Sequence, residues 1–214
     1  MKSILLIGLG RFGRHTAMKL QELGHQVMAV DKSEEQTEAV LPYVTAALIG
    51  DSTNPAFLST LGVESYDLCI VSIGDDFQSA LETTSLLKDA GAKFIVSRAS
   101  RGLHEKLLRN NGADAVVYPE KQLAEWTAIC YSSDYILDYI TVNETFAVYE
   151  IHTPEKWVGR TLLELNIRRR FQINVIAVKR GGELQLDVDP DAPLLREETL
   201  LVIGRESDVQ KVLK

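Results

Sequence analysis

Cysteine is scarce in this chain: its 214 residues include only Cys69 and Cys130, which lie far apart. That spacing excludes a disulfide framework and a cysteine-rich metal site, so we expect both thiols to be buried packing groups. Long apolar runs are lacking too, since none approaches the roughly 18 residues that a transmembrane helix needs. No signal peptide precedes the first predicted strand, and we therefore expect a cytoplasmic protein.

A basic excess is also missing. The net charge is −7, and acidic residues outnumber basic ones in residues 1–133 and again in residues 134–214. Neither part therefore carries the positive patch that would draw it to nucleic acid or to an anionic membrane surface. The composition of 45% hydrophobic and 25% charged residues is typical of a globular chain with one large domain or two modest ones.

A glycine motif follows the first hydrophobic run. Residues 3–7 are apolar apart from Ser3, the pattern Gly-x-Gly-x-x-Gly begins at Gly8, and apolar residues then recur at helical spacing up to residue 23. In a strand–turn–helix unit, Gly8 allows the tight turn, Gly10 lets a diphosphate approach, and Gly13 lets the helix pack on the strand. The sequence predicts a nucleotide site at this helix N-terminus; the alternative is a glycine turn that serves packing alone.

The second hydrophobic run, residues 26–30, ends in Asp31, which lies 18 residues beyond Gly13. An acidic residue at this distance accepts hydrogen bonds from both ribose hydroxyls and disfavours a 2′-phosphorylated nucleotide. This carboxylate strengthens the prediction of a nucleotide site.

Six predicted strands alternate with helices over the first 118 residues, at 3–7, 26–30, 45–49, 68–73, 93–96 and 115–117. This alternation predicts an α/β fold, a Rossmann-like, doubly wound parallel sheet. Ligands of such sheets bind beyond the carboxyl ends of the strands. The candidate binding residues are therefore Gly8, Gly10, Arg11, Phe12, Gly13, Asp31, Lys32, Ser33, Asp51, Ser52, Thr53, Ile73, Gly74, Asp75, Arg98, Ala99, Ser100 and Glu120.

A long helical stretch then leads to residue 133 and presents Leu123, Trp126, Ile129 and Cys130 on one side. We interpret it as a candidate dimer element, with plain core packing as the alternative. Beyond it the pattern predicts strands at 146–151, 173–178, 184–188 and 199–203 and helices at 161–170 and 207–213. We therefore divide the chain into a nucleotide-binding domain, 1–133, and a smaller α+β domain, 134–214.

Several of these motifs together resemble a known family. The residues are Gly8-Leu9-Gly10-Arg11-Phe12-Gly13, Val30-Asp31, Gly50-Asp51-Ser52-Thr53, Tyr118-Pro119-Glu120-Lys121 and the compact C-terminal module. They are similar to the RCK or KTN (TrkA-N plus TrkA-C) regulators of potassium conductance, nearest to the cytosolic Ktr-type gating subunits. The resemblance implies a non-enzymatic subunit that forms homodimers and then an octameric ring under a membrane potassium channel or transporter at the inner membrane. Exchange of ATP for ADP would change the shape of the ring.

The resemblance also assigns roles. Asp51 and Ser52 would border the adenine, and His104 matches a position near the phosphates. Glu120 matches an acid that coordinates a divalent cation, Mg²⁺ or Ca²⁺, between paired subunits, although it could equally cap the following helix. In the C-terminal module, the family's cyclic di-AMP site would correspond to Leu162, Leu163, Arg168, Asn174 and Val175.

Two arginines are candidate phosphate ligands on chemical grounds. Arg11 occupies a variable position of the glycine turn, from which a guanidinium can reach terminal phosphates of its own ligand or of a facing subunit. Arg98 offers a second cation. The alternatives are an exposed arginine that aids solubility and a surface salt bridge, respectively.

Catalysis has little support in this sequence. The four histidines, His15, His25, His104 and His152, are scattered, and the C-terminal module has no cluster of acid, base and nucleophile. Two alternatives to the regulatory subunit stay open. One is an NAD(H)-binding redox sensor or small oxidoreductase, because Asp31 also suits NAD; the other is a nucleotide or cyclic-dinucleotide sensor without a channel partner.

Overall fold

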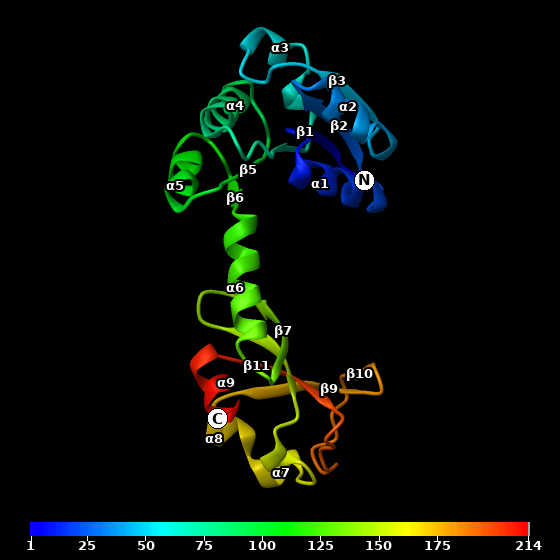
Figure 1. Cartoon of the computed structure of the whole chain (residues 1–214), viewed down its shortest axis with the longest axis vertical. Coiled ribbons are helices and arrows are strands. Elements are labelled where there is room, and N and C mark those ends of the chain that lie inside the picture. The colour runs from blue at the N-terminus through cyan, green and yellow to red at the C-terminus, as the bar shows by residue number, and fades with distance from the viewer. Residues whose placement is uncertain (214) are drawn as a thin grey trace. The chain divides into compact units, whose positions relative to one another are not determined.

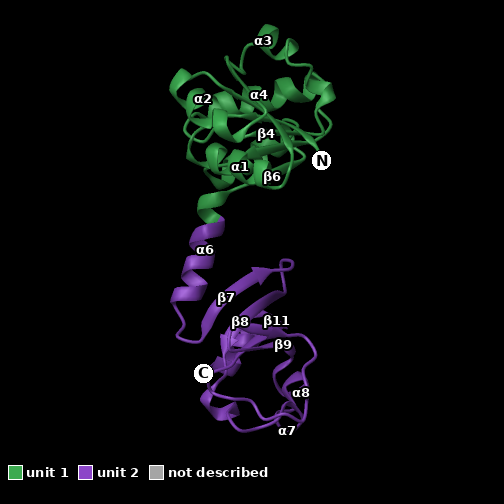
Figure 2. Cartoon of the chain, turned by 90° about the vertical axis from the view of Figure 1, so that its right-hand side faces the viewer, with its two compact units in different colours: residues 1–121 green, residues 122–214 purple. Residues whose placement is uncertain are grey.

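The computed structural model describes residues 1–213 and divides into two compact units, Met1–Lys121 and Gln122–Lys214 (Figure 2). The division falls twelve residues before the boundary that we predicted at 133/134. Trp126, Ile129 and Cys130 account for the difference, because their side chains pack in the core of the second unit. Among residues 1–213, none of the helices has the length and apolar character to cross a bilayer.

The first unit contains the predicted parallel sheet, with strand order β3-β2-β1-β4-β5-β6. Its strands alternate with helices along the chain (Figure 1). The strands are β1 (Ser3–Ile7), β2 (Gln26–Asp31), β3 (Ala46–Ile49), β4 (Leu68–Val71), β5 (Ile95–Arg98) and β6 (Ala115–Val117). The helices are α1 (Arg11–Glu22), α2 (Glu34–Val40), α3 (Pro55–Ser59), α4 (Phe77–Asp89) and α5 (Gly102–Asn110). The predicted Rossmann-like fold is confirmed.

The central strands are buried on both faces, as their near-continuous apolar sequence indicates. Ile4, Leu5, Leu6 and Ile7 of β1 are at most 1% exposed. Two strand ranges differ clearly from those expected: β4 ends at Val71 and not at residue 73, and the fifth strand, expected at 93–96, lies two residues later. The reason is that Ser97 is fully buried, with its hydroxyl bonded to that of Thr84 at 2.8 Å, so a polar residue continues the strand.

The second unit contains an antiparallel sheet with strand order β10-β9-β11-β8-β7. Its strands are β7 (Ile136–Thr141), β8 (Ala147–His152), β9 (Asn174–Arg180), β10 (Glu183–Gln185) and β11 (Thr199–Gly204). Its helices are α7 (Leu162–Leu165), α8 (Ile167–Phe171) and α9 (Glu206–Leu213), while α6 (Pro119–Tyr131) spans the division between the units. The predicted α+β character is confirmed.

Two expectations for this unit were wrong. The helix expected at 161–170 is two short helices, because Asn166 adopts a left-handed conformation (φ 45°) that ends α7 and starts α8. Asparagine tolerates this conformation better than other residues with a Cβ atom. We also expected a strand at 184–188, but β10 ends at Gln185, and β7 was not predicted at all.

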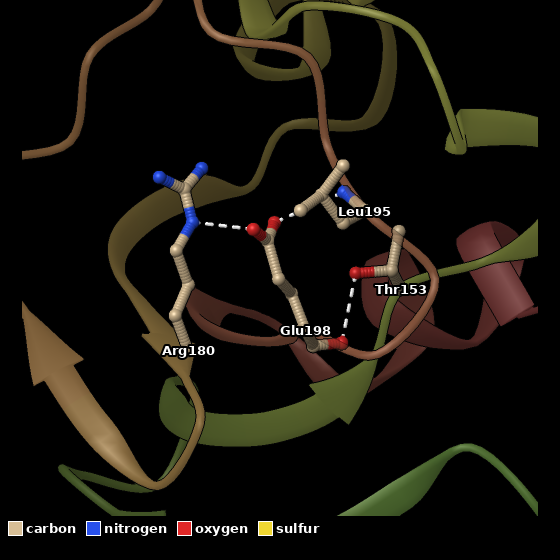
Figure 3. A network of polar contacts seen from close by, with 4 residues as sticks. All are labelled: Thr153, Arg180, Leu195 and Glu198. Atoms are coloured by element: carbon tan, nitrogen blue, oxygen red, sulfur yellow. Dashed lines mark hydrogen bonds and ion pairs between the residues drawn. The ribbon is translucent and has the colours of Figure 1, made fainter.

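A buried carboxylate braces the loop before β11. Glu198 accepts hydrogen bonds from Arg180 Nε and from the Leu195 backbone N–H, and its carbonyl accepts one from the Thr153 hydroxyl (Figure 3). The Glu198 side chain is only 3% exposed, so these bonds replace its lost hydration. The network joins β9, the end of β8 and the loop preceding β11.

Candidate functional site

A pocket of about 690 Å³ lies at the carboxyl ends of the strands of the first unit, where the topology predicts a ligand. The segments that follow β1, β2, β3 and β4 contribute to it, as do Arg98 at the end of β5 and the start of α6. The lining residues are Ile7, Gly8, Gly10, Arg11, Phe12, Val30, Asp31, Lys32, Gln36, Gly50, Asp51, Ser52, Ser72, Ile73, Gly74, Asp75, Asp76, Ser79, Arg98, Pro119 and Glu120.

The three glycines of the turn have different surroundings. Gly8 has φ +90°, which residues with a Cβ atom rarely adopt, and its N–H donates to Val30 O at 2.8 Å. A Cβ atom on Gly13 would overlap the Gly8 carbonyl and lie 2.7 Å from Ser72 Oγ, so this glycine lets α1 approach β1. Gly10 precedes α1 as its N-cap and has open space beside it. The first backbone N–H groups of α1 are thereby directed at an accessible anion site.

Asp31 is fixed by two backbone donors. Its Oδ2 accepts from the Leu9 N–H at 2.6 Å, and its Oδ1 accepts from the Ser33 N–H at 2.8 Å. Each carboxylate oxygen can accept a further hydrogen bond, and the side chain lines the pocket. The geometry thus fits the predicted role as acceptor of two ribose hydroxyls.

Arg98 and Glu120 form an ion pair in the pocket. Arg98 Nη2 donates to Glu120 Oε1, and the two side chains are 17% and 55% exposed. Burial acts to raise the pKa of Glu120, but its own backbone N–H, the Arg98 hydrogen bond and the charges of Arg98 and Arg11 outweigh burial. The pKa of Glu120 therefore lies below its ordinary value, and the group is an anion at neutral pH. The pair supports the salt-bridge alternative for Arg98.

Acidic side chains also line the pocket near the ends of β3 and β4. The backbone N–H and hydroxyl of Thr53 donate to Asp51 and lower its pKa. Hydrogen bonds from the hydroxyl and N–H of Ser79 lower the pKa of Asp76, which caps α4. Both carboxylates are thus anionic at neutral pH. The cations that line the pocket, among residues 1–213, are Arg11, Lys32 and Arg98.

Six predicted binding residues do not line this pocket: Gly13, Ser33, Thr53, Ala99, Ser100 and His104. Ser33 caps α2 by accepting from the Gln36 N–H, and Ala99 is fully buried. His104 stacks on Phe77 with ring centroids 3.7 Å apart and shares a 3.1 Å hydrogen bond with Ser100. Burial and the charge of Arg101 lower the pKa of His104. These residues lie outside the pocket lining, and direct contact between them and a ligand stays a prediction.

Sequence reasoning missed several lining residues: Ile7, Val30, Gln36, Gly50, Ser72, Asp76, Ser79 and Pro119. Gln36 is the most informative, because its Oε1 atom is buried and has no hydrogen-bond partner among residues 1–213. Gln36 and Ser79 each lie three residues after an N-cap, so their side chains can reach back toward the strand ends. The position three residues after Ser33 and Asp76 was the sequence signal from which Gln36 and Ser79 could have been predicted to line the pocket.

The structure adds little support to the two other predicted sites, the divalent-cation site at Glu120 and the cyclic di-AMP site in the second unit. Within residues 1–213 no three His, Cys, Asp or Glu side chains are grouped so as to hold a metal ion, and a metal ion at Glu120 stays a prediction. In the second unit, Leu163, Arg168 and Asn174 are exposed, whereas Leu162 and Val175 are partly buried. A cyclic di-AMP site at these residues stays a prediction.

Comparison with known proteins gives matches over both units. Residues 4–119 match the TrkA-N domain and residues 146–214 match the TrkA-C domain. The chain is 37% identical over 213 residues to the Ktr system potassium uptake protein C of Bacillus subtilis (strain 168), which covers 100% of this chain and 96% of that protein. It is 31% identical over 210 residues to the Ktr system potassium uptake protein A of the same organism, with 98% and 95% covered.

The fold also resembles a solved structure described as the GsuK channel bound to NAD. The TM-score is 0.71 at 19% sequence identity, and the match covers 100% of this chain but only 39% of that chain. This likeness establishes the shared fold of the two chains.

Proposed function

The chain belongs to the TrkA-N and TrkA-C domain family that includes the Ktr potassium uptake proteins, and on this premise we propose that it is a nucleotide-controlled regulatory subunit of a potassium transport system. It would act in the cytoplasm on a membrane channel or transporter subunit. The chain would assemble as homodimers into an octameric ring, and it would catalyse no reaction.

One observation carries the proposal: the pocket combines a carboxylate for ribose with cations and helix N–H groups for phosphates. Asp31 lies at the end of β2, while Gly10 and Arg11 lie at the N-terminus of α1. An adenine nucleotide with its ribose at Asp31 would direct its phosphates toward the α1 N-terminus and Arg98. This is the arrangement that such sheets use for dinucleotides and mononucleotides.

Arg11 is our candidate for distinguishing ATP from ADP. Its side chain is exposed and lines the pocket, so it can reach a terminal phosphate of its own ligand or of a facing subunit. A ligand shifts a conformational equilibrium only by its differential affinity for the two states. Moving a ring from about 1:99 to about 99:1 takes about 5.5 kcal/mol, which several subunits acting together can supply.

Two further ligands follow from the family resemblance. Glu120 would bind Mg²⁺ or Ca²⁺ only together with phosphate oxygens or a second subunit, because it is a single carboxylate that is already paired with Arg98. Cyclic di-AMP would bind the second unit. Titration of each ligand into the full chain, with and without ATP, tests both.

The main test is calorimetric titration of the full chain with ATP, ADP and NAD, together with solution scattering and native mass. We expect ATP and ADP to bind tightly with two different scattering profiles, and Arg11→Ala to lower the preference for ATP. Arg14→Ala is the matched control, since it removes the same charge from α1 at a residue outside the pocket lining. Equal ATP and ADP affinities with one unchanged profile would overturn the proposal.

NAD is the second candidate ligand, because Asp31 suits either nucleotide. NAD binding that is tighter than that of both adenine nucleotides, with a nicotinamide-dependent absorbance change in a substrate screen, would favour the redox sensor or small oxidoreductase.

A further inference from the structure

Arg98 is held in place in the pocket by its neighbours. Its guanidinium lies against the backbone of Gly74, where a Cβ atom would overlap Arg98 Nη1 and lie 2.6 Å from Cζ. The Phe12 ring lies on another side, with its centroid 5.5 Å from Arg98 Cζ. These contacts fix the guanidinium, and its Nε–H is buried without a partner among residues 1–213. The side chain therefore has unused donor capacity.

Glu120 already occupies an anion position beside this guanidinium. Its carboxylate accepts from Arg98 Nη2 and also experiences the charge of Arg11. Because the Glu120 side chain is 55% exposed, it can turn into water at small cost. Arg98, at 17% exposed and packed against Gly74 and Phe12, cannot follow it as easily.

We propose that Glu120 is a built-in counter-ion that competes with the ligand's phosphates for Arg98. The inference rests on the proposed function, because it requires a phosphate-bearing ligand in this pocket. A diphosphate carries more negative charge than a carboxylate and can pair with a guanidinium through two parallel hydrogen bonds. Phosphate binding therefore displaces Glu120, and each phosphate–Arg98 contact is formed at the expense of an existing ion pair.

The displacement has a structural consequence. Arg98 is the last residue of β5, and Glu120 lies in the first turn of α6. The ion pair ties that turn to the sheet, while Trp126, Ile129 and Cys130 farther along α6 pack in the core of the second unit. Phosphate binding removes one of the contacts that hold the first turn of α6 on the sheet of the first unit.

The test compares Glu120→Gln with the wild-type full chain by calorimetric titration with ADP, AMP and adenosine in EDTA. Removing the competing charge should tighten ADP binding about threefold to tenfold, tighten AMP binding less, and leave adenosine binding unchanged. Glu105→Gln is the matched control, because it removes the same charge and an exposed glutamate–arginine pair, with Arg109, from the same unit at a residue outside the pocket lining. We expect no selective gain for ADP in that variant.

A second background shows whether the gain depends on Arg98. In Arg98→Gln, or in Arg98→Met if the first does not fold, Glu120→Gln should no longer tighten ADP binding. Unchanged or weaker ADP binding in Glu120→Gln would overturn the competition, as would an equal gain in Glu105→Gln or a gain that persists without Arg98. If the wild-type chain binds none of ATP, ADP, AMP and NAD, the proposed function itself fails, which is a distinguishable result.

Discussion

The carboxylate of Asp31 accepts a 2.6 Å hydrogen bond from the backbone N–H of Leu9, so the end of β2 is bonded directly to the glycine turn after β1. The two parts of the pocket that would hold ribose and phosphate are thus positioned by each other. A ligand that meets such a prearranged site loses less free energy to ordering than one that must organise it.

We expect Asp31→Asn to weaken ATP and ADP binding about tenfold to a hundredfold, because hydrogen bonds to charged groups contribute about 1.5–3 kcal/mol. The amide has only one acceptor oxygen for Leu9, Ser33 and the ribose, and its NH₂ group would face a backbone donor. Titration calorimetry measures the loss, and discrimination between NAD and its 2′-phosphorylated form should decrease in parallel. An affinity equal to that of the wild type would contradict the assigned ribose contact.

Gly13→Ala and Gly10→Ala should separate stability from binding. At Gly13 the new methyl group would overlap the Gly8 carbonyl, so we expect the first unit to lose about 1–3 kcal/mol or more of unfolding free energy. A Cβ atom added to Gly10 would have no atom of residues 1–213 within 4 Å apart from its chain neighbours, and φ is −61°, so the fold should tolerate alanine. The methyl group would instead obstruct the approach of a phosphate. Urea unfolding followed by circular dichroism, with nucleotide titration, distinguishes the two effects. Similar losses of stability in both variants would refute this reasoning.

Gln36→Met should leave the ligand-free chain as stable as the wild type, or slightly more so. The buried Oε1 atom has no partner among the described residues, and replacing an unsatisfied acceptor with an apolar group of similar size removes its desolvation cost. Nucleotide affinity should fall about threefold to tenfold, because Gln36 lines the pocket and its oxygen would accept a hydrogen bond from the ligand after the side chain turns toward it. Gln21→Met, which removes a 3.3 Å bond to Pro42 O outside the pocket, is the control. Unchanged affinity in Gln36→Met would show that this oxygen does not contact the ligand.

Glu198→Ala should destabilise the second unit by about 2–4 kcal/mol, because it leaves the Leu195 N–H and the Arg180 guanidinium without their carboxylate. Both tryptophans of the chain, Trp126 and Trp157, belong to the second unit, so their fluorescence during urea unfolding reports on that unit alone. Glu155→Ala is the comparison: it breaks an ion pair with Arg196 in which both side chains are more than 60% exposed, and it should cost less than about 1 kcal/mol. Equal costs would mean that burial of Glu198 has no special importance.

Much of the first unit could be predicted because its signals are local. The apolar run before Gly8, the glycine spacing and the acid at Asp31 each depend on a few neighbouring residues, and strand ends in a parallel sheet converge on one edge. The second unit was harder to predict. Asn166 divides a stretch with helical periodicity, and β7 has no simple alternation of buried and exposed residues, since only Ile136 of that strand is buried.

The sequence by itself determined the α/β fold, the place of the pocket and the family, because glycine conformation, hydrophobic periodicity and the order of elements are properties of the chain read in order. Only the tertiary structure decided which side chains meet in the pocket. Arg98 and Glu120 are 22 residues apart, and Leu9 and Asp31 are also 22 apart, so the two pairs form only when crossovers bring different strand ends together. The unpaired Oε1 of Gln36 and the contact of Arg98 with Gly74, both within residues 1–213, likewise depend on packing, which no local pattern encodes.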